Sequence, residues 1–449
     1  MSVLMVSVSG IRGIIGNGLE PETIVKHTSA FAEFIKGKKI VIGRDGRISG
    51  EMVRNIIVGT LQAKGIDIVD LGICPTPTVL LMVRELKADG GIVITASHNP
   101  NEWNALKLVN NKGLFLSPEE NTLLRDIEKK SNFNYTTWDK LGKITFQDGI
   151  KTHIEKILSI KHLNIEKLKE KKFKVLVDCV NGAGSYCVTD LLKALGCEVI
   201  EINCEKNGIF PRLPEPIPQN LIETMSEVKN NNVDIGIVVD PDVDRLVLLT
   251  ETGEPFVEEN TITQITKFIL SKEKGNVVVN LSTTRAVKDV VEQTGCNLYL
   301  APVGEANVVK KMLEVNAIIG GEGSGGVIYP AANFCRDALV GIALTLQHLL
   351  EFGGKASELK KSLPEYFIVK RKFEIHGKNG DEILNNLKNE FKNYQLNDED
   401  GLRIDTEEYW INFRKSNTEP IIRITCEAKS EQKANEIIDN YLKIVEKYL

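Results

Sequence analysis

The chain has 449 residues, more than one hydrophobic core usually supports, so several domains of roughly 100 to 150 residues each are expected. Apolar residues make up 42% and charged residues 26%, which is typical of a globular protein. The net charge of -5 excludes the strongly basic surface that nucleic-acid-binding proteins usually present.

The eight cysteines are scattered without the paired spacing of a zinc site or a disulfide framework, so we expect reduced thiols. The first residues lack the basic start of a signal peptide. A run of roughly 18 apolar residues, the length of a membrane-spanning helix, does not occur in the sequence. We therefore expect a cytoplasmic protein that binds neither membranes nor nucleic acid and acts as a monomer or homodimer.

One pattern occurs three times along the chain: an apolar, β-branched stretch ends in a small or polar turn, and a helical pattern follows. Its copies are KKIVIGRDGRISG at 38–50, KFKVLVDCVNGAGS at 172–185 and GNVVVNLSTTRAV at 275–287. Each leads to a second apolar stretch that ends in a polar loop: GGIVITASHNP at 90–100, VDIGIVVDPDVDR at 233–245 and NAIIGGEGSGG at 316–326. The repetition predicts three similar α/β domains.

The continuous Val and Ile runs predict strands in mixed sheets that helices cover on both sides, with ligands gathering at the strand ends. The last part of the chain differs, because its pattern predicts strands within 366–377 and 407–428 and an amphipathic helix after Ser430, which suits an N-cap position. We expect a smaller α+β domain there. The four domains are placed at 1–150, 151–251, 252–366 and 367–449.

The loop VVDPDVDRL carries three carboxylates, Asp240, Asp242 and Asp244, followed by Arg245. Carboxylates so close together repel one another unless a cation or several donors compensate. Ligation by oxygen alone favours Mg2+. A solvated acidic turn is one alternative. An EF-hand loop is another, although Pro241, the arginine in place of the sixth-position glycine and the flanking strands argue against it.

Ser97, His98 and Lys107 lie in or just after the first polar loop. Ser97 is either a turn or cap serine before Pro100, or a nucleophile or phosphate carrier at a strand end. His98 is either a hydrogen-bonding loop residue or a catalyst. Lys107 is either an edge-strand lysine that reaches water, or a desolvated amine whose pKa is lowered towards use as a base. Taken singly, each residue leaves both interpretations open.

Two further loops carry groups that suit sugars and phosphates. GGEGSGGVIYP offers Glu322 and Ser324 on a glycine-rich backbone that allows close approach to a polyhydroxyl ligand, with a flexible turn as the alternative. FRKSNTEPIIR suits a phosphate dianion, with a capping loop as the alternative. Its cations and donors are Arg414, Lys415, Ser416, Asn417, Thr418 and Arg423.

Together these stretches resemble the α-D-phosphohexomutase superfamily, which includes phosphoglucosamine mutase and phosphomannomutase/phosphoglucomutase. SGIRG, TASHNP, DPDVDR, GEGSGG and RKSNTEP occur in the family's order across essentially the whole chain. The resemblance implies four domains around a central cleft, three of them alike. It also implies an isomerase that interconverts hexose 6-phosphates and hexose 1-phosphates through a phosphoserine and a hexose 1,6-bisphosphate.

The same resemblance implies roles for single residues. Ser97 is expected to carry the phosphoryl group and Lys107 to act as general acid and base, with Arg12, His98 and Arg245 close to the transferring phosphate. Mg2+ is expected on a phosphoserine oxygen of Ser97 together with Asp240, Asp242 and Asp244. Sugar hydroxyls are expected on Glu322, Ser324 and Gly325. The non-transferred phosphate is expected on Arg414, Ser416, Asn417, Thr418 and Arg423.

The sequence departs from the family pattern at Gly326 in the sugar loop, at Gly304, Glu305 and Ala306 in APVGEANV, and at Arg285. Gly326 stands where many relatives have histidine, and Arg285 stands where some have a phosphate-contacting lysine. GEGSGGVI and SNTEP look most like the branch assigned as phosphoglucosamine mutases, which predicts glucosamine 6-phosphate as the substrate. Phosphomannomutase/phosphoglucomutase activity is the alternative. A serine phosphomonoesterase and a non-catalytic sugar-phosphate sensor are remoter ones, and the intact Ser97, Lys107 and aspartate set argues against the sensor.

Overall fold

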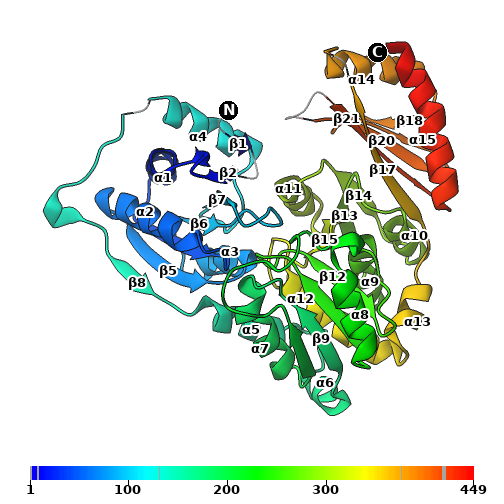
Figure 1. Ribbon diagram of the computed structural model, residues 1–449, viewed down its shortest axis with the longest axis horizontal. Coiled ribbons are helices and arrows are strands. Elements are labelled where there is room, and N and C mark those ends of the chain that lie inside the picture. The colour runs from blue at the N-terminus through cyan, green and yellow to red at the C-terminus, as the bar shows by residue number, and fades with distance from the viewer. Residues whose placement is uncertain (1–2, 8–9, 131, 376, 417–420, 449) are drawn as a thin grey trace. The chain divides into compact units, whose positions relative to one another are not determined.

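The computed structural model describes residues 3–7, 10–130, 132–375, 377–416 and 421–448. The chain divides into two compact units, one of Met1–Thr261 and Gly325–Lys360 and the other of Ile262–Ser324 and Lys361–Leu449 (Figure 1). None of the helices in the described ranges combines the length and apolarity that crossing a bilayer requires.

The first sheet is mixed, with the strand order β1-β2-β7-β6-β4-β5-β8 and with β3 paired to β2. Its strands are β1 (Leu4–Ser7), β2 (Gly10–Ile15), β3 (Gly18–Leu19), β4 (Lys39–Arg44), β5 (Asp67–Ile73), β6 (Gly90–Ile94), β7 (Trp103–Asn110) and β8 (Ile144–Phe146). The accompanying helices are α1 (Pro21–Ile35), α2 (Gly50–Ala63), α3 (Thr76–Glu85) and α4 (Pro118–Lys130). Strands β4, β5, β6 and β8 run parallel, whereas β7 is antiparallel to β6.

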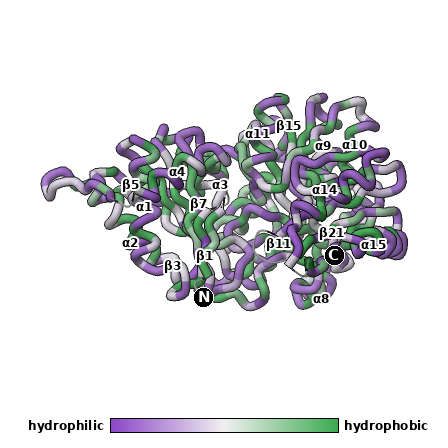
Figure 2. The backbone as a smooth tube through the Cα atoms, turned by 90° about the horizontal axis from the view of Figure 1, so that it is seen from above, coloured by the Kyte–Doolittle hydropathy of each residue, from purple (hydrophilic) through white to green (hydrophobic). Residues whose placement is uncertain are grey.

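The central strands β4 and β6 are apolar on both sides and are buried on both faces. On β4, Ile40 and Ile42 belong to a core cluster with residues of α1 and α2, whereas Val41 belongs to a second cluster with residues of α3. Successive side chains of a strand point to opposite faces, so helices cover both sides of the sheet. In Figure 2, apolar green backbone gathers in the middle of this region around β7.

The rest of the first unit is built around a second mixed sheet, β10-β9-β11-β12, in which only β12 is antiparallel to its neighbour. Its strands are β9 (Lys174–Asp178), β10 (Glu198–Ile202), β11 (Ile235–Val239) and β12 (Leu246–Thr250). Nearby in the chain are α5 (Gly149–Leu158), α6 (Ile165–Lys171), α7 (Val188–Ala194) and α8 (Ile222–Asn230). The returning segment contributes β16 (Gly326–Ile328) and α12 (Ala338–Phe352), and α13 (Ala356–Lys361) follows it.

The second unit begins within α9 (Glu258–Lys272) and contains two sheets. In one of them, β13 (Asn276–Asn280) runs parallel to β14 (Leu298–Ala301) on one side and to β15 (Ala317–Glu322) on the other. Its helices are α10 (Ala286–Gln293) and α11 (Glu305–Val315). The other sheet is antiparallel throughout, in the order β17-β21-β20-β19-β18. This second sheet belongs to the predicted C-terminal α+β domain.

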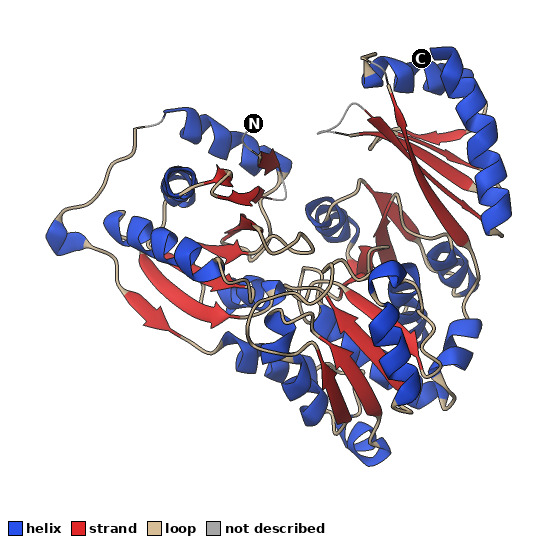
Figure 3. Ribbon diagram, viewed as in Figure 1, coloured by secondary structure: helices blue, strands red, loops and turns tan. Residues whose placement is uncertain are grey.

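The elements of the C-terminal domain are β17 (Phe367–Glu374), α14 (Gly380–Glu390), β18 (Gln395–Asn397), β19 (Leu402–Asp405), β20 (Trp410–Lys415), β21 (Ile421–Ala428) and α15 (Glu431–Val445). Helices α14 and α15 lie along its sheet (Figure 3). Ser430 caps α15 as predicted, because its side chain accepts a hydrogen bond from the backbone N–H of Lys433.

The polar loops predicted to carry chemistry all follow central strands. Residues 95–102 connect β6 to its antiparallel partner β7, and residues 240–245 connect β11 to β12. The glycine-rich loop begins where β15 ends at Glu322. Because parallel strands end at the same edge of a sheet, each loop stands at the edge where α/β proteins bind ligands.

Phe31 of α1 tests the packing of the first core. It is fully buried and stacks on Phe34 with ring centroids 6.3 Å apart. Phe31→Ala is expected to lower the free energy of unfolding by about 3–5 kcal/mol, because it removes apolar contacts and leaves a cavity. A urea titration followed by circular dichroism measures the loss.

Leu123→Ala is the matched control, because the Leu123 side chain on α4 is 60% exposed. Its effect is expected to stay within about 0.5 kcal/mol. Losses of equal size for the two variants would contradict the assignment of Phe31 to the core.

Candidate functional site

Ser97 occupies the turn directly after β6, with its backbone in the left-handed region at φ 50°. A residue with a Cβ held there costs roughly 1–2 kcal/mol, so the surrounding contacts must impose the conformation. The side chain is buried, and its Oγ donates a hydrogen bond to Asp240 Oδ2 at 3.1 Å. Its Oγ also lies 3.3 Å from His98 Nδ1. The turn therefore aims the hydroxyl at the loop that follows β11.

Arg47 holds this turn in place. Its fully buried guanidinium donates from Nη2 to the carbonyls of Ser97 (2.5 Å) and Asn99 (2.8 Å), and from Nη1 to that of Pro100 (2.7 Å). Asp45 pairs with its Nε at 2.9 Å, and burial raises the pKa of Asp45. The sequence analysis did not identify Arg47. The sequence signal that could have identified Arg47 is the motif GRDGR, in which an aspartate and arginines stand at the end of a strand.

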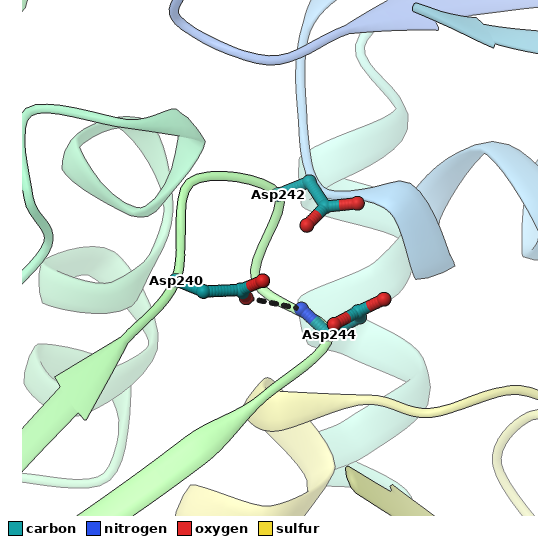
Figure 4. A group of neighbouring side chains, drawn as sticks. All are labelled: Asp240, Asp242 and Asp244. Atoms are coloured by element: carbon teal, nitrogen blue, oxygen red, sulfur yellow. Dashed lines mark hydrogen bonds between the residues drawn. The ribbon is translucent and has the colours of Figure 1, made fainter. Parts of the chain in front are cut away.

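Asp240, Asp242 and Asp244 lie in the turn between β11 and β12 and are fully buried (Figure 4). One oxygen from each carboxylate lies within 4.8 Å of those from the other two. Asp240 Oδ1 accepts hydrogen bonds from the backbone N–H groups of Asp244 and Arg245, both at 3.1 Å. These bonds fold the turn back on itself, so the three side chains converge.

The cluster is compensated from neighbouring elements. Lys107 of β7 donates from Nζ to Asp242 Oδ2 at 2.7 Å and lies 3.7 Å from Asp244 Oδ2. Thr76, at the start of α3, donates its hydroxyl to Asp242 Oδ2 at 2.6 Å and its backbone N–H to the Asp242 carbonyl at 2.9 Å. Thr76 was not predicted. No motif in the sequence pointed to it, because the contact joins residues that are far apart in the chain.

Charge and burial set the protonation of this cluster. Burial, followed by the charges of Asp244 and Asp242, raises the pKa of Asp240 well above its usual range. Burial would also raise the pKa of Asp242, but the Lys107 ammonium and its hydrogen bond outweigh it and hold that pKa below its usual value.

The pKa of Lys107 is raised, whereas one interpretation of the sequence was a lowered pKa. Burial lowers the pKa, but the charges of Asp242 and Asp244 outweigh burial and raise it. Lys107 is therefore an ammonium in this arrangement, because the nearest charged groups are carboxylates rather than cations.

The aspartates fit a divalent cation. Among the residues that the structure describes, Asp242 Oδ1 and Asp244 Oδ1 are buried and have no hydrogen-bond partner. Buried carboxylate oxygens without partners are costly, and a metal ion relieves that cost. The donors are all oxygen, which suits Mg2+ better than zinc or other softer ions.

Three more predicted residues lie around Ser97. Arg12 of β2 donates from Nη1 to Asn99 Oδ1 at 2.6 Å. Burial, and then the charges of Arg245 and Arg12, lower the pKa of His98 to about 2, so its imidazole is neutral at physiological pH. Arg245 lies with its Nε 4.0 Å from Asp244 Oδ1. The first unit therefore brings together all the residues predicted to handle the transferring phosphate and metal.

In the second unit, Glu322 is held by its own domain. The buried carboxylate accepts through Oε1 from Asn280 Nδ2 at 2.9 Å and from the backbone N–H of Gly304 at 3.0 Å. The adjacent Val303 donates its N–H to Asp400 Oδ2 at 3.0 Å, and Arg414 Nε donates to Asp400 Oδ1 at 2.9 Å. Asp400 therefore links the segment beside Glu322 to the predicted phosphate-binding arginine.

The two other glycine-loop residues fall on either side of the division between the units. Ser324 is half-buried and ends a segment of the second unit. Gly325 begins a segment of the first unit, with φ 86° and its carbonyl accepting from the backbone N–H of Leu246 at 2.9 Å. The positive φ and the close approach to Leu246 both favour glycine at this position.

Arg414 and Arg423 are direct partners in the register of β20 and β21, so both side chains lie on one face of the sheet. Two guanidinium groups on one face can together bind a phosphate dianion. Ser416 is buried, and its N–H donates to the Ile421 carbonyl at 3.0 Å. Asn417 and Thr418, the other predicted donors, lie outside the described residues.

Arg285 has a structural use that the sequence did not predict. Its guanidinium donates to the carbonyls of Thr406 at 2.6 Å and Glu407 at 2.7 Å, and its backbone N–H donates to the Glu427 carboxylate at 2.8 Å. These bonds join the loop after β13 to the C-terminal sheet.

The buried pair of Asp45 and Arg47 provides a stability test. Arg47→Met leaves Asp45 as an uncompensated buried carboxylate and is expected to cost about 3–5 kcal/mol of unfolding free energy. The double variant Asp45→Asn/Arg47→Met is expected to lose less, because no buried charge then lacks a partner. Urea titrations of the variants measure the coupling, and a larger loss in the double variant would contradict it.

Comparison with known families finds matches along the whole chain. The descriptions that match are "Phosphoglucomutase/phosphomannomutase, alpha/beta/alpha domain I" at residues 4–134, domain II at 151–253, domain III at 259–367 and the C-terminal domain at 368–444.

Individual proteins are similar over nearly their full length. A phosphoglucomutase/phosphomannomutase of Thermococcus kodakarensis is 35% identical over 98% of both chains. A phosphoglucosamine/phosphogalactosamine mutase of Sulfurisphaera tokodaii is 34% identical over 97% of this chain and 98% of the relative. A solved structure of a phosphoglucomutase/phosphomannomutase family protein from Burkholderia thailandensis has a TM-score of 0.86 at 26% identity, covering 98% of both chains.

Proposed function

Because this chain belongs to the phosphoglucomutase/phosphomannomutase family of phosphohexomutases, which are isomerases, we propose that it interconverts glucosamine 6-phosphate and glucosamine 1-phosphate. The observation that carries the chemistry is the Ser97 hydroxyl, which is buried 3.1 Å from Asp240 with Lys107 bound to Asp242. The similarity to the phosphoglucosamine/phosphogalactosamine mutase supports the choice of an amino sugar.

In the first step, phosphoserine 97 transfers its phosphoryl group to the 1-hydroxyl of the 6-phosphate. The bond between phosphorus and Ser97 Oγ breaks as a bond to the sugar oxygen forms, which produces a 1,6-bisphosphate. The attacking hydroxyl loses a proton and the leaving Ser97 Oγ gains one. Lys107 is the group proposed to give its proton to Ser97 Oγ and to take the proton of the attacking hydroxyl. Arg12 and Arg245 stabilise charge on the phosphoryl oxygens, which is the main contribution a protein makes to phosphoryl transfer.

In the second step, the bisphosphate turns around and its 6-phosphoryl group returns to Ser97. A bond from Ser97 Oγ to phosphorus forms as the bond between phosphorus and the 6-oxygen breaks. Ser97 Oγ loses a proton, the 6-oxygen gains one with Lys107 as the proposed carrier, and glucosamine 1-phosphate leaves. The phosphoserine is restored, so the overall reaction is an isomerisation. The neutral imidazole of His98 lies beside the Ser97 Oγ without adding a charge to the site.

The rest of the substrate is proposed to bind the glycine-rich loop after β15 and residues of the C-terminal domain. Glu322, Ser324 and Gly325 contact the sugar hydroxyls, and Arg414 and Arg423 with Ser416 bind the phosphate that is not being transferred. The cross-strand pair of arginines supports this assignment, because two guanidinium groups on one face can bind one phosphate dianion. Asn417 and Thr418 complete the proposed loop.

Mg2+ is the proposed cofactor, on Asp240, Asp242, Asp244 and an oxygen of phosphoserine 97. When bound there, it neutralises charge on the phosphoryl group. The buried Oδ1 atoms of Asp242 and Asp244 support this site. The 1,6-bisphosphate is proposed as the activator, because it phosphorylates a protein whose Ser97 carries no phosphate.

Ser97→Ala tests the carrier role. The variant is expected to lose at least about 10⁴-fold in turnover while still binding sugar phosphate, because only the nucleophile is removed. Mass spectrometry of the unchanged protein incubated with 1,6-bisphosphate is expected to place phosphate on Ser97. Ser226→Ala, on α8, is the control. Mutase activity retained by Ser97→Ala, or phosphate mapped consistently to another residue, would refute the role.

A comparison of substrates tests the sugar. We expect kcat/KM to be highest for glucosamine 6-phosphate and lower for the 6-phosphates of mannose and glucose. An amine and a hydroxyl differ by about 1–3 kcal/mol in a polar site, so some mixed activity is expected. A preference for mannose or glucose would favour the alternative phosphomannomutase/phosphoglucomutase activity, in line with the Thermococcus relative. Release of inorganic phosphate as the main product would instead indicate a phosphomonoesterase.

A further inference from the structure

Gly326, at the start of β16, leaves space that another side chain uses. A Cβ at this position would lie 2.2 Å from Cδ and 2.8 Å from Cγ of Arg336. Both distances are well inside van der Waals contact, so the aliphatic part of Arg336 occupies the space that a side chain at residue 326 would need. The requirement for glycine therefore comes from packing, since Gly326 is not among the residues with positive φ.

Through this space the Arg336 side chain reaches the aspartate turn at residues 240–245. Its Nη2 donates a hydrogen bond to Asp244 Oδ2 at 2.5 Å, with side chains that are 12% and 0% exposed. The other oxygen of this carboxylate, Asp244 Oδ1, has no hydrogen-bond partner among the described residues. One oxygen of Asp244 is thus held by an arginine, and the other remains available to a cation.

The backbone around Arg336 is anchored on both sides. The N–H of Asp337 donates to the Val327 carbonyl at 2.8 Å, and the N–H of Ala338 donates to the Val243 carbonyl at 3.1 Å. Asp337 also caps α12 by accepting from the N–H of Leu339 at 3.0 Å. The start of α12 is therefore tied to β16 and to the aspartate turn itself, which places the Arg336 side chain between them.

We propose that Arg336 is a positioning residue for the aspartate turn at residues 240–245. Gly326 leaves room for the Arg336 side chain because glycine has no side chain of its own. Arg336 holds Asp244 Oδ2 and thereby orients Oδ1 towards the oxygens of Asp240 and Asp242. This inference rests on the proposed function, because it takes the three aspartates as the Mg2+ site. A side chain at residue 326 would have to displace the aliphatic part of Arg336, which reaches Asp244 through that space.

The test measures Mn2+ binding to the full-length, dephosphorylated protein by isothermal titration calorimetry, with Mn2+ standing in for Mg2+. Arg336→Met is expected to weaken Mn2+ binding by about 10–100-fold, the usual effect of removing a group that orients a metal ligand. Gly326→Ala is expected to weaken binding as well, although residue 326 contacts no carboxylate, because its Cβ displaces Arg336. The double variant is expected to bind no more weakly than Arg336→Met alone.

Two controls make comparable changes elsewhere in the first unit. Arg54→Met breaks another ion pair with a buried aspartate, in which Arg54 Nη2 lies 2.5 Å from Asp70 Oδ2. Gly59→Ala adds a methyl group on α2 where nothing lies within 4 Å of the new Cβ. Neither is expected to change Mn2+ affinity. Circular dichroism identifies the variants that fold, and Gly326→Ala tests the proposal if Arg336→Met does not fold.

The outcomes separate this inference from the proposed function. Unchanged or tighter Mn2+ binding by folded Arg336→Met would overturn the positioning role, as would unchanged binding by Gly326→Ala if that is the only folded variant. Additive losses in the double variant would overturn the link to Gly326. Absence of Mn2+ binding by the unchanged protein would contradict the metal site of the proposed function itself. A weakening of Mn2+ binding without a change in the preferred sugar would support the inference on its own.

Discussion

Repulsion among three buried carboxylates is the constraint on which the first unit depends. Asp240, Asp242 and Asp244 are fully buried and lie close together, so they need positive charge and hydrogen-bond donors from outside their own turn. Lys107 comes from β7, Thr76 from α3, the Ser97 hydroxyl from the turn after β6 and Arg336 from the segment before α12. Elements far apart in the chain must pack together to supply these groups. The charged cluster is therefore stabilised only when the first unit is folded.

The repeated architecture explains how such groups can meet. In the first unit, a polar turn follows a central strand twice and the next strand returns antiparallel to it, as with β6 and β7 or β11 and β12. This arrangement places Lys107 opposite Val93 on the neighbouring strand, although it is ten positions beyond Ser97 in the sequence. A hairpin of two interior strands in a mixed sheet thus combines the turn that carries Ser97 with a side chain on a rigid strand.

Much of the organisation was predictable from the sequence. The resemblance to the phosphohexomutases is confirmed by the family matches, and so are the three α/β domains with mixed sheets and the C-terminal α+β domain. The boundaries placed between the domains, the roles of individual site residues and the cytoplasmic location stay predictions. Arg47, Thr76 and Arg336 were not predicted, because each acts through tertiary contacts. For Thr76 and Arg336 no local pattern distinguishes the residue from other polar residues.

The local pattern of residues sets which of them stand in the polar turns, because apolar runs of β-branched residues form buried strands and the polar residues that interrupt them must lie at strand ends. The repeated pattern also sets three similar α/β domains, and the different pattern after them sets a fourth. The charge state of Lys107 follows from the folded arrangement and not from the local sequence, since its pKa depends on carboxylates that follow a strand of another sheet. Likewise, the space at Gly326 matters only because Arg336 fills it in the folded chain. Packing and electrostatic energies depend on distances between residues, and the order of residues in the sequence does not set these distances.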